Sequence, residues 1–268
     1  MRLKGAVVVV TGASSGIGKA TALAFAKRKA RLALGARRLD RLNAVAKMCL
    51  QQGSPDVSVR RLDVGQSADA RAFVAAALRD HDRIDVLVNN AGLGWMGRLH
   101  EMPEDKVEEL VATNFKGVIT TMQAALPAML ARRSGVIINV ASVVGFRASP
   151  YSAVYSATKH AVVGLSHALR GELSGTGVKV CVVYPGVTDT EFFDATEVPV
   201  GPMYSASWVA NLIVRTAQFP RRDAMVMPIR FAHLAEPLLG GLMDHGLGEA
   251  RRLASPHLSG TGVPPPES

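Results

Sequence analysis

Residues 6–18 read AVVVVTGASSGIG, and this stretch decides the fold. Its first five residues are apolar without a break, which predicts a β-strand covered on both faces, as in a parallel sheet. The glycines that follow permit a tight turn and let a phosphate group approach backbone N–H groups closely. The helix that starts near Ile17 adds the partial positive charge of its N-terminus. Because the turn directly follows a strand, it predicts a phosphate-binding site; a purely structural turn is the alternative.

The rest of the chain repeats this alternation of strand and helix. Apolar or β-rich runs predict seven strands, at residues 6–10, 32–36, 57–62, 84–89, 136–141, 178–184 and 225–228. Helical periodicity predicts helices at residues 17–29, 39–50, 68–80, 104–132, 154–172 and 206–218. Pro127 should kink or divide the longest of them.

Strands that alternate with helices pair in parallel through right-handed crossovers. The pattern therefore predicts an α/β fold with one doubly wound parallel sheet of about seven strands, whose ligands bind at the carboxyl ends of the strands. No internal segment rich in proline, glycine and serine divides the chain. We expect a single domain over residues 1–259 and a flexible tail at residues 260–268.

Composition excludes several classes of protein. Of 268 residues, 48% are apolar and 20% are charged, which excludes a chain disordered throughout. No uncharged apolar run is long enough for a membrane-spanning helix, and the apolar stretch near the N-terminus is too short for a secretory signal. Cys49 and Cys181 make no disulfide framework and have no metal-ligand spacing. These features predict a cytoplasmic protein without an integral membrane segment or a metal site.

Positive charge is concentrated in residues 27–47, which hold eight basic residues and one acid. Such a window attracts anions such as phosphates. It contains no aromatic residue that could stack on a base, so we expect no nucleic-acid partner. Most of these side chains fit a solvated helix face. Arg37 and Arg38 differ, because they follow the end of a predicted strand.

Further motifs follow the glycine turn in a fixed order. They are Asn89-Asn-Ala-Gly92 at the fourth strand, Ser142 after the fifth, Tyr155-Ser-Ala-Thr-Lys159 on a helix, and Pro185-Gly186 after the sixth strand. With Asn114 in the long helix and the G-x-x-x-G-x-G spacing of residues 12–18, this order resembles the short-chain dehydrogenase/reductase family in its compact branch. The resemblance covers about residues 4–193. It implies a Rossmann-type fold and an oxidoreductase that uses a nicotinamide dinucleotide.

The residues after the second strand bear on which dinucleotide is used. An Asp or Glu there would bond the free 2′-hydroxyl of NAD(H) and repel a 2′-phosphate. Ala36 and Arg37 occupy this position. Because a guanidinium pairs well with a phosphate, and relatives with Arg at this place tend to use NADP(H), we expect NADP(H). Arg38 either assists Arg37 or is a surface charge.

The resemblance also implies the remaining cofactor contacts. The glycine turn would hold the phosphates, and Asp63 would accept from the adenine amino group, although it could instead only cap its own turn. Thr188 stands where the family usually has an aliphatic residue. The expected cofactor contacts are Gly12, Ser14, Ser15, Gly16, Ile17, Gly18, Arg37, Arg38, Asp63, Val64, Asn90, Ala91, Gly92, Tyr155, Lys159, Pro185, Gly186, Val187, Thr188 and Thr190.

Four residues are expected to carry the chemistry. Tyr155 and Lys159 lie four apart on a predicted helix, so their side chains share a face. The ammonium of Lys159 should lower the pKa of Tyr155 and make the phenol a general acid or base. By the same resemblance, Ser142 would orient the substrate carbonyl, and Asn114 would fix a water that links Lys159 to solvent.

Three segments are expected to surround a small-molecule carbonyl or alcohol substrate: residues 93–99, residues 143–152 and a lid at about 192–205. Their composition is mostly apolar, which suits an apolar substrate. Arg98 and Arg147 could each meet an acidic group or lie at the surface.

Residues 229–255 depart from the compact family pattern and are expected to form a C-terminal cap, as a lid helix, a dimer contact or a membrane-surface helix. We expect a homodimer or homotetramer. The predicted function is hydride transfer between NADP(H) and a carbonyl or alcohol carbon. Two alternatives are an NADPH-binding sensor or scaffold without turnover, and a sugar-nucleotide epimerase or dehydratase, against which the glycine spacing and the chain length argue.

Overall fold

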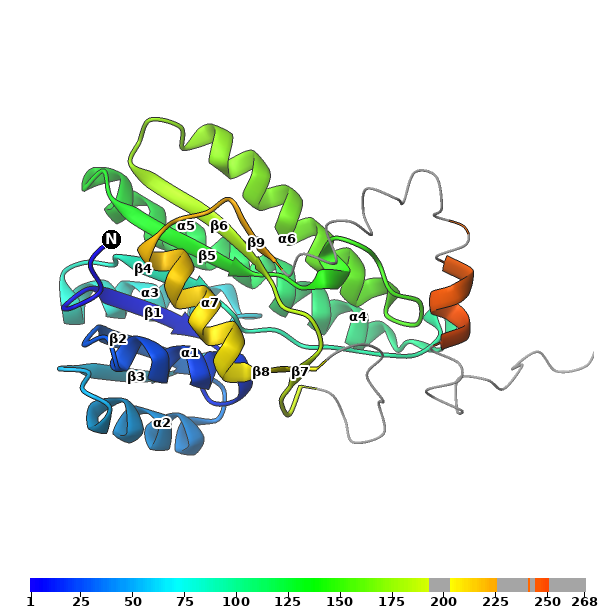
Figure 1. Cartoon of the computed structure of the whole chain (residues 1–268), viewed down its shortest axis with the longest axis horizontal. Helices are drawn as coiled ribbons and strands as arrows, with labels where there is room; N and C mark the ends of the chain where they lie inside the picture. Colours follow the sequence, from blue (N-terminus) through cyan, green and yellow to red (C-terminus); the bar gives the residue numbers. More distant parts are fainter. Residues whose placement is uncertain (193–202, 226–240, 242–243, 251–268) are drawn as a thin grey trace, which may run out of the picture.

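A seven-stranded parallel sheet forms the centre of the protein (Figure 1). The computed structural model describes residues 1–192, 203–225, 241 and 244–250. The strands stand in the order β3-β2-β1-β4-β5-β6-β9, and all neighbours run parallel. Their bounds are β1 Val7–Thr11, β2 Arg31–Ala36, β3 Val57–Arg61, β4 Val86–Asn89, β5 Gly135–Val140, β6 Val178–Tyr184 and β9 Asp223–Met225.

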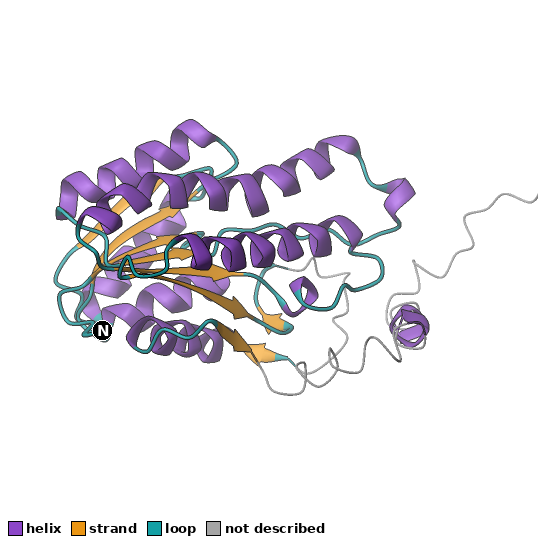
Figure 2. Ribbon diagram, turned by 90° about the horizontal axis from the view of Figure 1, so that it is seen from above, coloured by secondary structure: helices purple, strands orange, loops and turns teal. Residues whose placement is uncertain are grey.

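Helices cover both faces of this sheet (Figure 2). One face carries α1 Gly16–Ala26, α2 Leu39–Gln51 and α7 Ala206–Gln218. The other carries α3 Ser67–His81, α5 Gly117–Ala131 and α6 Ala153–Glu172. The shorter elements are α4 Glu104–Val111, the 3-10 turns η1 Leu99–Glu101 and η3 Val143–Gly145, the π-helical turn η2 Ala112–Lys116, and the parallel pair β7 Thr188–Asp189 and β8 Tyr204–Ser205.

The valines of β1 explain why the sheet has a core on each face. Val8 and Val10 belong to the core under α1, α2 and α7, whereas Val9 belongs to the opposite core. This division arises because successive side chains of a strand alternate between faces. Each buried side chain of this kind contributes roughly 1.5–3 kcal/mol, so a strand made of valines is held from both sides.

The position of β1 also sets the place of the site. β1 lies between β2 and β4, where the order of the strands reverses. In open α/β sheets, ligands bind at the carboxyl ends of the strands beside this reversal. The topology confirms the predicted doubly wound sheet and directs attention to the turn after Thr11.

The long helix expected at residues 104–132 is divided, but not at Pro127. The break is the π-helical turn η2, and Pro127 lies inside α5. Pro127 and Gln123, whose carbonyl loses its helical partner, are both exposed, so water can satisfy that carbonyl. The π turn buries Asn114 and lets Gly117 approach the backbone of Val64 closely. A one-residue widening at a functional site is a common use of such turns.

Expectations about the C-terminal part fall wholly or partly outside the described residues at three places. The seventh strand β9 ends at Met225, where a strand at 225–228 was expected, and residues 226–228 lie outside the described part. Of the expected lid at 192–205, residues 193–202 lie outside it, and Tyr204–Ser205 form β8 beside β7. Of the expected cap, residues 244–250 are helical, and the expected tail at 260–268 is not described.

Among the described residues, no helix is long and apolar enough to cross a membrane, and no group of three His, Cys, Asp or Glu side chains could hold a metal ion. Cys49 and Cys181 are buried as free thiols. Burial raises the pKa of Cys49 to about 12 and that of Cys181 to about 11, so neither is a reactive thiolate.

Candidate active site

One cavity of about 740 Å³ opens at the carboxyl edge of the sheet. Its walls contain nearly every residue that the sequence singled out, from the glycine turn, the ends of β2, β4, β5 and β6, and the first turns of α6. Two of the expected residues, Gly18 and Asn114, are not part of the lining. A volume of this size suits an extended ligand such as a dinucleotide with a small substrate.

The glycine turn is shaped by contacts that leave no space for a side chain. Gly12 has a φ of +69°, and a Cβ there would lie 2.8 Å from the Cα of Ala91. A Cβ at Gly18 would overlap the carbonyl oxygen of Gly12 and lie 2.6 Å from Nδ2 of Asn90. The turn therefore presents bare backbone beside the first turn of α1, a cradle that fits a diphosphate.

The end of β4 locks this turn in place. The hydroxyl of Thr11 accepts hydrogen bonds from the backbone N–H groups of Asn90 and Ala91, both at 3.0 Å. The side-chain amide of Asn90 donates to the carbonyl of Thr11 at 3.1 Å. These bonds join β1 and β4 across the reversal point, so Asn90 shapes the turn in addition to lining the cavity.

Two arginines stand on the rim beside the glycine turn, and both face carboxylates. Nη1 of Arg37 lies 3.3 Å from Oε1 of Glu109. Arg38 donates to the hydroxyl of Ser15 at 2.6 Å and to Glu191 at 3.1 Å. Neither acid was expected from the sequence, because Glu109 and Glu191 lie 72 and 153 residues away from their partners. No short-range pattern signals such pairs.

Asp63 lines the same cavity and accepts the N–H of Gly65 at 3.0 Å. Its carboxylate therefore closes its own turn, which is the alternative that the sequence left open. Val64 lies beside it on the cavity wall and packs against Gly117 of α5.

Ser142, Tyr155 and Lys159 come together in the centre of the cavity. The side chains of Ser142 and Tyr155 share a hydrogen bond. Nζ of Lys159 lies 5.7 Å from the centre of the Tyr155 ring and donates to the carbonyl of Val140 at 3.1 Å. The expected spacing of four residues thus places the phenol and the amine on one face of α6, as predicted.

The pKa of Tyr155 moves opposite to the expectation. Burial raises it to about 12, and the hydrogen bond with Ser142 opposes this only in part. Burial also lowers the pKa of Lys159 to about 8. That Lys159 lowers the pKa of Tyr155 stays a prediction, because in the protein by itself desolvation of the phenol outweighs an ammonium that donates to the Val140 carbonyl. Tyr155 is held as a neutral phenol, the form that can donate a proton.

The buried amine of Lys159 makes its contribution to the free energy of unfolding rise with pH. In the unfolded chain Lys159 has its ordinary pKa of 10.5, so between about pH 8 and 10.5 the unfolded state holds a proton that the folded state has released. We expect Lys159 to contribute about 2 kcal/mol to the free energy of unfolding between about pH 8 and pH 10. The buried Cys49, Cys181 and Tyr155, whose pKa values burial raises, act in the opposite sense in the protein and in Lys159→Met alike. Urea unfolding of both proteins at both pH values therefore isolates the contribution of Lys159 as their difference, and an equal change in the two would contradict it.

Asn114 lies behind the cavity wall and binds backbone. Its Oδ1 accepts the N–H of Leu93 at 2.8 Å, and its Nδ2 donates to the Leu93 carbonyl at 2.9 Å and to Thr158 at 3.2 Å. The side chain of Asn114 thus fixes the segment after Gly92. A Cβ on Gly92 itself would lie 3.5 Å from Nζ of Lys159. Both N–H donors of the amide are engaged, and its oxygen keeps one lone pair besides the bond from Leu93.

A buried chain of polar side chains supports α6, and the sequence analysis missed it. Thr121 donates to Asn89 at 2.7 Å, Asn89 to Asn139 at 2.9 Å, and Asn139 to Ser166 at 2.9 Å. The chain links α5, β4, β5 and α6 inside the protein. Asn139 inside the apolar run VIINV is the signal that could have revealed it, since a buried amide needs partners.

The substrate side of the cavity is mostly apolar, with Trp95, Met96 and Phe192 in its lining. The Phe192 and Tyr155 rings lie 5.8 Å apart, and a Cβ at Gly94 would touch Phe192. Arg147 also lines this side and pairs with Asp244 at 2.5 Å, which ties the helical segment 244–250 to the loop after Ser142.

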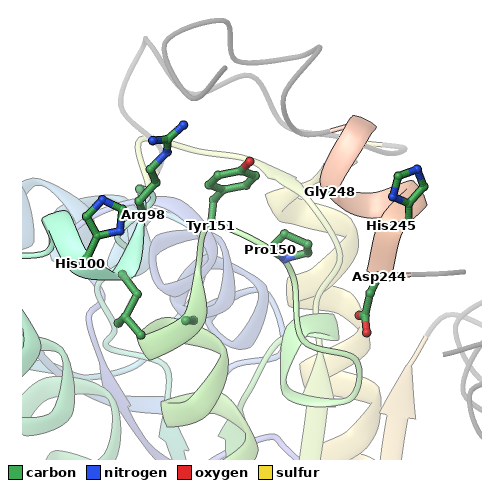
Figure 3. A pocket seen from close by; sticks show the side chains of 10 residues that line it. Arg98, His100, Pro150, Tyr151, Asp244, His245 and Gly248 are labelled. Carbon is green, nitrogen blue, oxygen red and sulfur yellow. The ribbon is translucent and has the colours of Figure 1, made fainter. Parts of the chain in front are cut away.

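Arg98 belongs to a second pocket of about 420 Å³ outside this cavity. Arg98 and His100 lie on one side of Tyr151, with Asp244 and His245 on the other (Figure 3). Of the two arginines that could meet an acidic group, Arg147 lines the 740 Å³ cavity and Arg98 lines the second pocket.

Comparison with known proteins agrees with this geometry. A family model for short chain dehydrogenases matches residues 6–207. An uncharacterized oxidoreductase of Staphylococcus saprophyticus is 41% identical over 194 residues, which are 72% of this chain and 78% of that protein.

Two solved structures are similar over most of the chain. An alcohol dehydrogenase from the archaeon Thermococcus sibiricus, complexed with 5-hydroxy-NADP, is 32% identical with a TM-score of 0.76, covering 83% of this chain and 96% of its own. A short chain dehydrogenase/reductase from Burkholderia phymatum in complex with NAD is 26% identical with a TM-score of 0.81, covering 91% and 96%. The chain described here, an oxidoreductase by descent and by fold, therefore belongs to the short-chain dehydrogenase family.

Proposed function

We propose that the protein is an NADP(H)-dependent oxidoreductase that transfers a hydride between the nicotinamide and a carbonyl or alcohol carbon of a largely apolar small molecule. One observation carries the proposal: Ser142, Tyr155 and Lys159 meet in the same cavity as the bare glycine turn. The bound dinucleotide supplies or accepts the hydride. The residues of the chain supply the proton and the orientation.

In carbonyl reduction the substrate carbon gains a hydride and its oxygen gains a proton. Ser142 donates a hydrogen bond to that oxygen, and Tyr155, neutral because burial raises its pKa to about 12, donates the proton. Lys159 holds its positive charge 5.7 Å from the centre of the ring as the phenolate forms. In alcohol oxidation the same groups act in reverse. Phe192 and Trp95 give this part of the cavity an apolar wall, with the Phe192 ring 5.8 Å from that of Tyr155.

The choice of NADP(H) rests on charge. Arg37 and Arg38 stand on the rim after β2, and the strand ends in Ala36, where a carboxylate would serve NAD(H). The archaeal relative complexed with 5-hydroxy-NADP supports this choice, whereas the Burkholderia relative is in complex with NAD, so the family fold by itself leaves both open. The guanidinium pair is the feature that favours the phosphorylated cofactor.

Replacing Arg37 by aspartate is expected to change the ratio of kcat/KM for NADPH over NADH by about a hundredfold toward NADH, because attraction to the 2′-phosphate becomes repulsion. Initial rates with each cofactor and one substrate measure this ratio. Arg71→Asp makes the same charge change on α3 and should leave the ratio within about twofold. A ratio that moves equally in both variants would refute the phosphate contact.

The turnover test distinguishes an enzyme from an NADPH-binding sensor or scaffold. NADPH oxidation is followed at its absorbance with a panel of aliphatic and aromatic aldehydes and ketones, beside a direct measurement of NADPH binding. We expect binding together with substrate-dependent oxidation. Tight binding without oxidation by any member of the panel would favour the sensor.

The wider expectations belong to the same proposal. We take residues 1–259 as a single domain. The protein acts in the cytoplasm as a homodimer or homotetramer.

A further inference from the structure

Glu191 lies among the cations that the proposed 2′-phosphate would need. Its Oε2 lies 3.1 Å from Nη1 of Arg38 and 2.5 Å from Nη1 of Arg41. Arg38 also donates to the hydroxyl of Ser15, the residue before α1, at 2.6 Å. A carboxylate, two guanidinium groups and a hydroxyl therefore meet at one point on the rim of the cavity.

Thr190 and Phe192, the sequence neighbours of Glu191, pack against two other parts of the cavity wall. A Cβ at Gly16 would lie 3.2 Å from the side chain of Thr190, so this residue packs on the glycine turn. On the other side of Glu191, the ring of Phe192 packs near Tyr155 at 5.8 Å. The tripeptide at residues 190–192 thus touches the glycine turn, the arginine rim and the catalytic phenol in succession.

The carboxylate of Glu191 and a 2′-phosphate would compete for the same guanidinium groups. Hydrogen bonds from Arg41 and Arg38 lower the pKa of Glu191, so its carboxylate is ionised at neutral pH. A 2′-phosphate would seek charge-assisted bonds from Arg38 and would also repel the carboxylate. Both anions cannot hold the same guanidinium at full strength.

We propose that Glu191 is a specificity-determining residue that occupies the 2′-phosphate position with its carboxylate and weakens binding of NADP(H) relative to NAD(H). The proposal rests on the proposed use of NADP(H). Glu109 is the lesser competitor, because it faces only Arg37, at 3.3 Å, and is itself held by Lys106 at 2.9 Å. Removing the charge of Glu191 frees Arg38 and Arg41 together.

Titration calorimetry with two probes tests this without any substrate. 2′,5′-ADP carries the 2′-phosphate, and 5′-AMP is the same adenosine fragment without it. Glu191→Gln is expected to bind 2′,5′-ADP about fivefold more tightly than the unchanged protein, with the affinity for 5′-AMP within about twofold. Glu108→Gln removes an exposed charge on α4 next to Glu109 and should shift both probes by less than about twofold.

The outcomes separate the two proposals. If neither the unchanged protein nor Glu191→Gln binds 2′,5′-ADP more tightly than 5′-AMP, both the NADP(H) assignment and the role of Glu191 are overturned. If the unchanged protein prefers 2′,5′-ADP but Glu191→Gln does not strengthen that preference, only the role of Glu191 is overturned. An equal gain in Glu108→Gln would also overturn it, because the effect would then be general charge and not competition.

Discussion

Replacing Tyr155 by phenylalanine is expected to lower kcat about a thousandfold and to leave the affinity for NADPH within about twofold. The substitution removes only the phenolic oxygen, which shares a hydrogen bond with Ser142 and has its proton retained by burial. Lys159, which also lines the cavity, already donates to the carbonyl of Val140 and is therefore not placed to give the substrate a proton instead. Steady-state rates and fluorescence titration with NADPH measure the two quantities separately.

Tyr184→Phe is the matched control for this prediction. The hydroxyl of Tyr184 is also buried, but it donates to Asp223 of β9 at 3.2 Å and is not part of the cavity lining. Its loss should cost roughly 1 kcal/mol of stability and leave kcat within about threefold. Full activity in Tyr155→Phe, or an equal loss in both variants, would remove Tyr155 from the mechanism.

Replacing Gly18 by alanine is expected to weaken NADPH binding by about tenfold or more and to lower the midpoint of thermal unfolding by about 5 °C. The new methyl group would overlap the carbonyl oxygen of Gly12, which is backbone and cannot rotate away. The turn would have to open, and the amide of Asn90 that ties it to Thr11 would be displaced. Calorimetric titration and a thermal melt measure the two effects.

Gly164→Ala provides the control for a glycine in a helix. Gly164 lies inside α6, and a Cβ there would meet nothing within 4 Å. Alanine should therefore stabilise the helix by roughly 0.5–1 kcal/mol and leave NADPH binding unchanged. If Gly18→Ala leaves NADPH binding unchanged, as Gly164→Ala should, the close packing of the turn does not determine how tightly the dinucleotide binds.

Much of the fold could be predicted from short stretches of sequence. The run of valines at residues 7–10, the glycines at 12, 16 and 18, and the spacing of Tyr155 and Lys159 each depend on neighbours a few residues away. Strand alternation, helical periodicity and turn geometry are all set by residues only a few positions apart in the sequence. For the same reason the predicted strand order reversal and the cavity at the carboxyl ends were confirmed.

Other features depend on contacts between residues that are remote in the sequence. The break at Ala112–Lys116 accompanies the close approach of Gly117 to Val64, which no local pattern encodes. The helix stays intact around Pro127 because Pro127 and Gln123 face water, an exposure that depends on how α5 packs. The chain from Thr121 to Ser166 forms only when two helices and two strands meet.

The sequence alone determined the family and the sheet and predicted which side chains carry the chemistry, because these follow from residue type and spacing. Only the tertiary structure decided how those side chains ionise and what surrounds the arginines. The pKa of Tyr155 rises because packing removes water from it, against the effect expected of Lys159. Arg38 meets Glu191 because the fold brings together residues 153 positions apart, and the resulting charge balance belongs to the folded chain alone.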